Sequence, residues 1–281
     1  MKEIHVFLRG GLGNQLFQFA AGLSLAKKQE YILTVDCSTG FKRDKVYNRN
    51  FQLNNILNEK NSVDFMFYKR FFRRRDFLKN TYEFFNKSKI INDENFDGYH
   101  KQNTIKYILD DYFQSETYFK NVRDELIIRF KKLISITNHV TIDLPEKYIS
   151  IGIRLYEETT NPTDYNKDGK PFNVKLFLNK ILEGLDNNEK AVVFTYKKNP
   201  LLEEFYNNQN IQFIFGDEEN LTDFETMLVF AKGNKLFFNN SSYYWWAAWI
   251  AENVFALKSE SINVFDNFLN TKTVPTRWMK I

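Results

Sequence analysis

The chain has 281 residues, of which 43% are hydrophobic and 26% are charged, and its formal net charge is +4. This length suits one large domain or two domains of ordinary size, and the hydrophobic content excludes a chain that stays disordered. The single cysteine, Cys37, excludes an intrachain disulfide. No apolar run approaches the roughly 18–20 residues of a membrane span, and the charge is too small to indicate a nucleic-acid partner by itself. We therefore expect a cytoplasmic protein.

The first elements are a strand, a glycine turn and a helix. Residues 4–8 form a short apolar run, and Gly10-Gly11-Leu12-Gly13 follows it. After these glycines, apolar residues recur at helical spacing as far as Leu25. A second apolar run, over residues 31–36, ends at Asp36. The sequence therefore predicts a β-α-β unit at its start.

The rest of the chain alternates between strand and helix patterns. An irregular middle part has helical patterns over 65–85 and 118–134 and a strand-like run over 104–113. The alternation then resumes, with strands expected over 148–153, 190–195, 211–215 and 235–239 and helices over 174–185, 201–207, 222–231 and 244–253. Such alternation predicts an α/β protein with mainly parallel sheets. We expect two domains, 1–145 and 146–281, which face each other across a cleft and meet in the polar stretch 137–146.

The glycine-rich turn is the first candidate binding element. Gly11 and Gly13 would let the backbone approach a ligand, and the N-terminus of the following helix favours anions. The amides of Asn14 and Gln15 would suit sugar hydroxyls at the edge of a cleft. A dinucleotide-binding fingerprint would need glycine where Leu16 stands, so the match to that motif is weak. A tight turn without a ligand remains the alternative.

A second candidate is Arg154, which follows the strand predicted over 148–153. The carboxyl ends of parallel strands are where open α/β sheets bind ligands, and a guanidinium can hold phosphate oxygens through two parallel bonds. Glu157 and Glu158 come soon after and could supply a general base. The alternative is a solvated loop with one salt bridge.

The third candidate is Asn240-Ser241-Ser242, between a predicted strand and an aromatic helix that contains Trp245-Trp246. Hydroxyls and backbone N–H groups at a helix N-terminus can bind phosphate, and one serine can also serve as the N-cap. The three histidines and one cysteine lack metal-ligand spacing, and Asp110-Asp111 lies in a strand-like run. We therefore predict no metal site.

Four segments together resemble the bacterial α-1,2-fucosyltransferases, glycosyltransferase family 11. In chain order they are Gly10–Gln15 with the aromatic helix after it, Arg49–Leu53, Tyr112–Phe119 and Asn240–Trp249. The resemblance implies a GT-B-type arrangement of two Rossmann-like domains, with the acceptor on the N-terminal side and the donor bound by the C-terminal domain. It also implies GDP-β-L-fucose as donor, inversion at the anomeric carbon, and neither a metal nor another cofactor.

The resemblance further implies roles for individual residues. The implied donor-binding residues are Gly11, Gly13, Asn14, Gln15, Arg154, Asn240, Ser241 and Ser242. Arg154 matches the first arginine of a His-x-Arg-Arg-x-Asp motif, which binds the donor pyrophosphate in the wider superfamily. Glu157 stands at the acidic position of that motif and is the implied general base, with Glu158 as the alternate. The implied acceptor is a hydroxyl, O2 of a galactoside, in a bacterial surface glycan such as lipopolysaccharide or capsule, or in a lipid-linked glycan.

The chain departs from this pattern at several positions. Gly152 stands for the histidine of the motif, Leu155 for its second arginine, and Tyr244 for a common serine. Thr195-Tyr196-Lys197 replaces an acidic Ser-Asp-Asp stretch. A different GDP-deoxysugar or linkage therefore stays open, as does a non-catalytic relative that binds GDP or a glycan.

Two further hypotheses stay open. The opening β-α-β unit could belong to a dinucleotide-dependent oxidoreductase in which Asp36 binds a ribose. The basic-aromatic run Tyr68–Arg75 could hold the protein against the inner face of a membrane, or it could be a solvated helix face. We expect no nucleic-acid partner.

Overall fold

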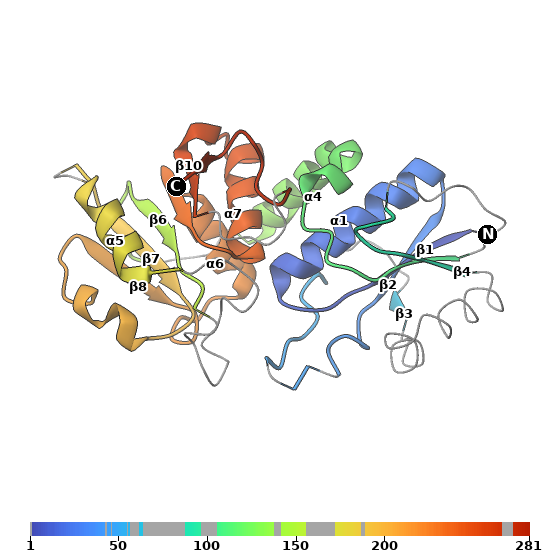
Figure 1. Ribbon diagram of the computed structural model, residues 1–281, viewed down its shortest axis with the longest axis horizontal. Coiled ribbons are helices and arrows are strands. Elements are labelled where there is room, and N and C mark those ends of the chain that lie inside the picture. Colours follow the sequence, from blue (N-terminus) through green and yellow to red (C-terminus); the bar gives the residue numbers. More distant parts are fainter. Residues whose placement is uncertain are drawn as a thin grey trace. The chain divides into compact units, whose positions relative to one another are not determined.

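The computed structural model describes residues 2–42, 44–45, 47–54, 56, 62–63, 88–96, 106–137, 142–155, 172–186, 189–265 and 272–281. The chain forms two compact units, Met1–Arg129 and Phe130–Ile281, drawn in Figure 1. The division falls inside helix α4 (Arg123–Ile136), earlier than the 145/146 boundary expected from the sequence. Arg129 in this helix donates to the Ile56 carbonyl in the first unit, whereas Phe130 packs against Trp246 in the second. The boundary between the two units therefore lies within α4 and not in the polar stretch 137–146.

The N-terminal unit contains a five-stranded sheet in the order β3-β2-β1-β5-β4, and all its strand pairs are parallel. Its strands are β1 (Glu3–Phe7), β2 (Ile32–Asp36), β3 (Ser62–Val63), β4 (Ser88–Ile91) and β5 (Lys106–Leu109). Helix α1 (Leu12–Gln29) follows β1, as predicted. It lies so close to β1 that a Cβ on Gly22 would be 2.1 Å from Val6 Cγ2. This close approach explains why a glycine is tolerated within the helix.

Two short 3₁₀ helices, Glu116–Tyr118 and Lys120–Val122, precede α4, so the helix expected over 118–134 begins later than predicted. The strand expected over 104–113 is also shorter in the structure, because β5 ends at Leu109. Phe113 has a φ of 52°, which an extended strand cannot contain. The helical pattern over 65–85 lies outside the described residues.

The C-terminal unit contains a six-stranded sheet in the order β11-β10-β9-β6-β7-β8, again with parallel pairs only. Its strands are β6 (Ile149–Gly152), β7 (Ala191–Thr195), β8 (Ile211–Phe215), β9 (Lys235–Phe238), β10 (Ile262–Val264) and β11 (Met279–Lys280). Counted along the chain, this is the 3-2-1-4-5-6 order of the doubly wound Rossmann fold. The α/β class with parallel sheets, predicted from the alternation of elements, is confirmed.

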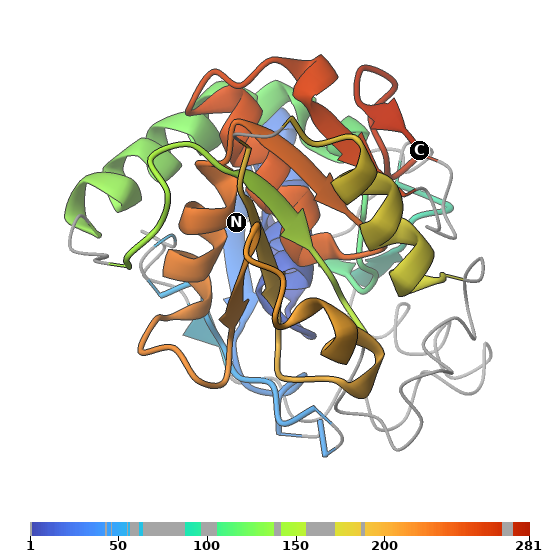
Figure 2. The same ribbon diagram turned by 90° about the vertical axis from the view of Figure 1, so that its left-hand side faces the viewer.

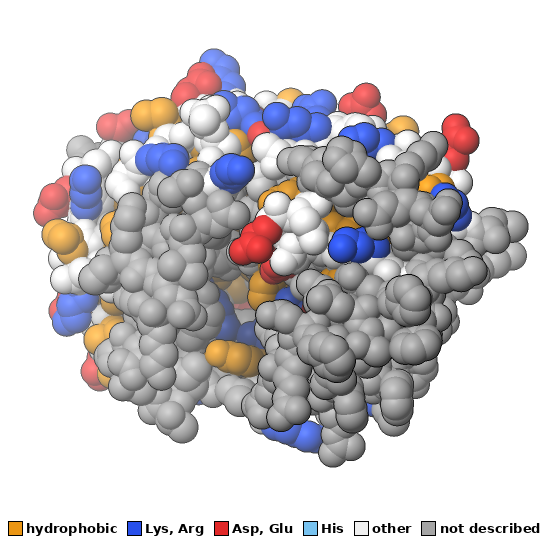
Figure 3. Space-filling view, turned by 45° about the vertical axis from the view of Figure 1, so that its right-hand side comes forward, with side chains coloured by type: hydrophobic (Ala, Val, Ile, Leu, Met, Phe, Trp, Pro, Cys, Tyr) orange, Lys and Arg blue, Asp and Glu red, His pale blue; other side chains and the backbone are white. Residues whose placement is uncertain are grey.

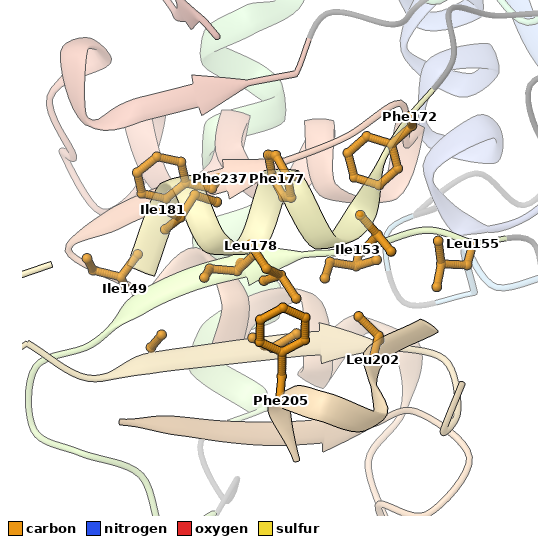
Figure 4. Close-up of a cluster of buried hydrophobic side chains, with 14 residues drawn as sticks. Ile149, Ile153, Leu155, Phe172, Phe177, Leu178, Ile181, Leu202, Phe205 and Phe237 are labelled. Atoms are coloured by element: carbon orange, nitrogen blue, oxygen red, sulfur yellow. The ribbon is translucent and has the colours of Figure 1, made fainter. Parts of the chain in front are cut away.

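The two faces of this sheet are covered by different helices (Figure 2). Helix α5 (Val174–Glu183) and the 3₁₀ helix Pro200–Phe205, which the sequence suggested as a short helix over 201–207, lie on one face. Their side chains form a hydrophobic cluster with Ile149 and Ile151 of β6 (Figure 4). Helices α6 (Asp223–Ala231) and α7 (Ser242–Asn253) lie on the other face.

Strand β6 shows why the second pair of helices comes close. The residues of β6 that face α6 and α7 are small, Ser150 and Gly152. The Ser150 hydroxyl donates to the Phe230 carbonyl at 2.8 Å. Helix α7 is almost fully buried and carries Trp245, Trp246 and Trp249 into the core. The structure therefore assigns this aromatic run a packing role.

On the face drawn in Figure 3, the described Lys and Arg side chains are spread among acidic and polar ones. Among the described side chains on this face, the basic ones are therefore not gathered into one patch.

Candidate functional site

In the C-terminal unit, the site lies where the strand order reverses. From β6 the chain proceeds through β7 to β8 on one side, and β9 then pairs with β6 on the other side. The loops that leave the carboxyl ends of β6 and β9 therefore diverge, and open α/β sheets bind ligands at such a point. Arg154 follows β6, and Asn239-Asn240-Ser241 follows β9.

Asn239 holds the backbone of Arg154 through two hydrogen bonds. The Arg154 N–H donates to Asn239 Oδ1 at 2.9 Å, and Asn239 Nδ2 donates to the Arg154 carbonyl at 2.9 Å. The asparagine is fully buried, whereas Arg154 is half-buried. The Asn239 side chain thus extends the pairing of β6 with β9 beyond the last strand residues. It fixes the position of the Arg154 backbone at the end of the sheet.

The N-terminus of α7 lies beside this arginine loop. Ser241 is the N-cap, and its hydroxyl accepts from the Tyr244 N–H at 3.4 Å. The N–H groups of Ser242 and Tyr243 belong to the first turn, which has no earlier carbonyls to accept them. No acidic side chain stands in that turn. The helix end therefore presents donors and partial positive charge close to the Arg154 loop.

The structure brings together Arg154, Asn240, Ser241 and Ser242 from the residues predicted by sequence. The predicted carboxylates Glu157 and Glu158 lie outside the described residues. Leu155, at the position of the second arginine in the motif, is fully buried in the hydrophobic cluster against α5. Tyr196 follows β7 at the same edge of the sheet and is 47% exposed.

In the N-terminal unit, the glycine-rich turn enters α1 as predicted. Gly10 has a φ of +78°, and Gly11 is an N-cap without a side-chain hydrogen bond. A Cβ on Gly11 would lie 2.9 Å from Arg49 Nη1, so the guanidinium passes directly over this glycine. Asn14 is half-buried and accepts from Gln114 Nε2 at 2.8 Å. A cation and two amides therefore surround an uncapped helix end.

Gln15 has another role than the sugar contact suggested by its sequence. Its side chain is fully buried, and Nε2 donates to the carbonyls of Gly10 and Asn50 at 2.9 Å each. Its Oε1 accepts from the Gln52 N–H at 3.0 Å. Gln15 thus ties the glycine turn to the segment that carries Arg49, and Gly13 is buried within α1.

A charged cluster that the sequence did not predict lies at the carboxyl end of the N-terminal sheet. Arg9, which follows β1, pairs with Asp110, which follows β5, and its guanidinium lies 4.7 Å from the centre of the Tyr112 ring. Burial and the nearby charge of Asp111 raise the pKa of Asp93 to about 6. The adjacent acids at 110–111 were the available signal, but the sequence placed them inside a strand that ends at Leu109.

Asp36 does not present an exposed carboxylate for a ribose. It is fully buried, and its Oδ1 accepts from the N–H groups of Ser38 and Thr39 at 3.0 and 2.9 Å. The hypothesis of a dinucleotide-dependent oxidoreductase therefore lacks the exposed acidic residue that it needs at the end of β2.

Two further observations concern only the described part of the chain. No helix in it combines the length and apolarity needed to cross a bilayer. Its His, Cys, Asp and Glu side chains form no group of three or more that could hold a metal ion. The basic-aromatic run Tyr68–Arg75 lies outside it.

Sequence comparison finds no matching family model and no matching curated protein. Comparison of structures finds likenesses over most of the chain. NodZ α-1,6-fucosyltransferase co-crystallised with GDP is 13% identical, with a TM-score of 0.44 over 91% of this chain and 92% of that one. NodZ from Bradyrhizobium is 14% identical with the same score and coverage. A mutant of Arabidopsis thaliana FUT1 in complex with GDP is 12% identical, with a TM-score of 0.49 over 98% of this chain and 72% of that one.

Proposed function

We propose that the protein is a GDP-sugar-dependent glycosyltransferase that transfers L-fucose from GDP-β-L-fucose. The observation that carries the proposal is the Asn239 clamp, which holds Arg154 beside the N-terminus of α7 at the strand-order reversal. This combination suits a pyrophosphate, because a guanidinium and helix N-terminal amides both favour phosphate oxygens. The four sequence segments that resemble the α-1,2-fucosyltransferases supply the choice of guanine and fucose.

The proposed reaction is a single displacement. An acceptor hydroxyl oxygen forms a bond to C1 of fucose while the bond from C1 to the β-phosphate oxygen breaks, which inverts the anomeric carbon. The hydroxyl proton passes to a carboxylate, for which Glu157 is the proposed base and Glu158 the alternate. Negative charge that develops on the leaving GDP is stabilised by Arg154 and by the N–H groups at Ser242 and Tyr243.

We propose that the two units bind different substrates. The C-terminal unit binds the donor through Arg154, Asn240, Ser241 and Ser242. The N-terminal unit supplies the acceptor side, with the backbone at Gly11 and the amide of Asn14 available near a ligand. We assign no ligand contact to Gln15, since its three hydrogen bonds to backbone groups occupy the amide.

The finer specificity is part of the same proposal. The acceptor is O2 of a galactoside in a bacterial surface glycan or a lipid-linked glycan, and the reaction uses no metal. A different GDP-deoxysugar or linkage is the alternative, because Gly152, Tyr196 and Tyr244 depart from the family pattern at the donor edge.

A second candidate function is a GDP- or glycan-binding protein without turnover. It is favoured by Leu155, which fills a core position where the motif has a second arginine. Such a protein would bind GDP but release no fucose to any acceptor.

The experiment that tests the proposal is a thermal-shift series with GDP, GDP-fucose, GDP-mannose, UDP-glucose and NAD, each with and without EDTA. A ligand that binds only the folded protein raises Tm by mass action. We expect stabilisation by GDP and more by GDP-fucose, unaffected by EDTA. No response to guanine nucleotides would contradict the proposal. Binding without transfer to galactosides would favour the second candidate.

A further inference from the structure

We infer that Tyr244 is a positioning residue for the nucleotide site, and that Gly152 is its structural counterpart. The inference rests on the proposed function, since it concerns how that same site keeps its shape. Tyr244 lies in the first turn of α7, and its side chain reaches across the ends of two neighbouring strands. It is only 6% exposed, so it acts from beneath the site.

The first contact is with β6. A Cβ on Gly152 would lie 2.6 to 2.8 Å from three carbons of the Tyr244 ring. Real Cβ atoms do not approach other atoms so closely, so the ring occupies the space that any side chain at position 152 would need. The two residues fit only as a pair, with the smallest residue under a large ring.

The second contact is with β7. The Tyr244 hydroxyl donates to the Phe194 carbonyl at 2.9 Å in a buried position. The same carbonyl accepts from the Ile153 N–H at 2.9 Å. Ile153 directly precedes Arg154, so Tyr244 and the arginine loop are bonded to a common oxygen.

One side chain therefore ties the start of α7 to the ends of β6 and β7. The main-chain N–H of Tyr244 is bonded to the capping hydroxyl of Ser241. A shift of the ring would move the first turn of α7 relative to Arg154, and these are the two groups proposed to hold the pyrophosphate. The two departures from the family pattern, Gly152 and Tyr244, thus occupy one space and compensate each other.

The test is the dissociation constant of GDP, measured by isothermal titration calorimetry together with Tm. We expect Tyr244→Phe to weaken GDP about 5-fold and Gly152→Ala about 10-fold. The matched control is Tyr148→Phe, because Tyr148 is also buried and its hydroxyl donates to the Val229 carbonyl at 2.7 Å. Tyr148 precedes β6 and so lies at the opposite edge of the same sheet. Its variant should lower Tm comparably and leave GDP affinity within about 2-fold.

A double-variant cycle tests the pairing. If Gly152→Ala acts by displacing the ring, it should cost GDP affinity in the wild-type background and less than about 2-fold in a Tyr244→Ala background. Equal losses in both backgrounds would overturn the inference. So would GDP affinities in Tyr244→Phe and Gly152→Ala that match Tyr148→Phe. If the wild-type protein itself fails to bind GDP, the proposed function falls, and this inference falls with it.

Discussion

The carboxamide of Asn239 forms a two-point clamp on the backbone of Arg154, donating to its carbonyl and accepting from its N–H, both at 2.9 Å. A carboxamide is the side-chain group that can copy both halves of a strand-to-strand pairing. It therefore orders the second residue beyond β6 through that residue's backbone alone.

The clamp predicts the effect of Asn239→Asp. A carboxylate still accepts from the Arg154 N–H but cannot donate to its carbonyl, which leaves a buried acceptor unpaired at a cost of about 1–3 kcal/mol. We expect a lower free energy of unfolding and at least 10-fold weaker GDP binding. Urea unfolding and calorimetry measure the two effects. Asn210→Asp, at an exposed position, is the control. Unchanged GDP affinity in Asn239→Asp would contradict the role of the clamp.

Arg154 itself is predicted to act on binding rather than on stability. Arg154→Ala removes charge-assisted hydrogen bonds of about 1.5–3 kcal/mol each, so GDP affinity should fall by 10-fold or more. Arg154→Lys should also bind poorly, because an ammonium lacks the planar fork of the guanidinium. Because the side chain is half-buried, Tm without ligand should change little.

The control for these variants is Lys232→Ala, which removes an exposed cation elsewhere in the same unit. Near-normal turnover in both Arg154 variants would rule out the proposed pyrophosphate contact.

Gln15 is predicted to act mainly on stability. Gln15→Leu leaves the Gly10 and Asn50 carbonyls and the Gln52 N–H without their partner, at about 1–3 kcal/mol for each group that stays buried. We expect a clear drop in the midpoint of urea unfolding. Gln209→Leu is the matched exposed control. A midpoint equal to that of the wild type would show that Gln15 does not brace the turn.

Asp93 predicts a pH dependence of stability. Its pKa is raised from 3.8 to about 6 by burial and by Asp111, so between these values the folded state holds a proton that the unfolded state has lost. Stability from this group therefore decreases as pH rises from about 4 to 6. Asp93→Asn should remove this decrease and be more stable than the wild type at pH 8.

The measurement is urea unfolding of wild type and Asp93→Asn from pH 4 to 8. Asp124→Asn, whose side chain is 93% exposed, is the control and should follow the wild-type profile. A constant difference between Asp93→Asn and wild type across this range would contradict the shifted pKa.

The sequence predicted most of the fold because parallel strands buried on both faces read as continuous apolar runs. The run 211–215 coincides with β8. Strands β3, β10 and β11 were not predicted, since they have only two, three and two residues, and so short a run carries no measurable period. Strand β4 was also not predicted, although its four residues equal those of β6 and β9.

The candidate site was only partly visible in the sequence. Arg154 and Ser241 could be identified because each follows a predicted strand. The role of Asn239 depends on the register that places Gly152 opposite Phe238, and one sequence does not contain that register. Gln15 was misread for a similar reason, because its burial is created by a segment about 35 residues away in the chain.

The four tryptophans of the chain are Trp245, Trp246, Trp249 and Trp278, and all of them lie buried in the C-terminal unit. Tryptophan fluorescence of this protein therefore comes from the C-terminal unit alone. Loss of this emission reports melting of the C-terminal unit, while circular dichroism reports both units together. Any lag between the two signals during denaturation would measure how independently the two halves of the protein melt.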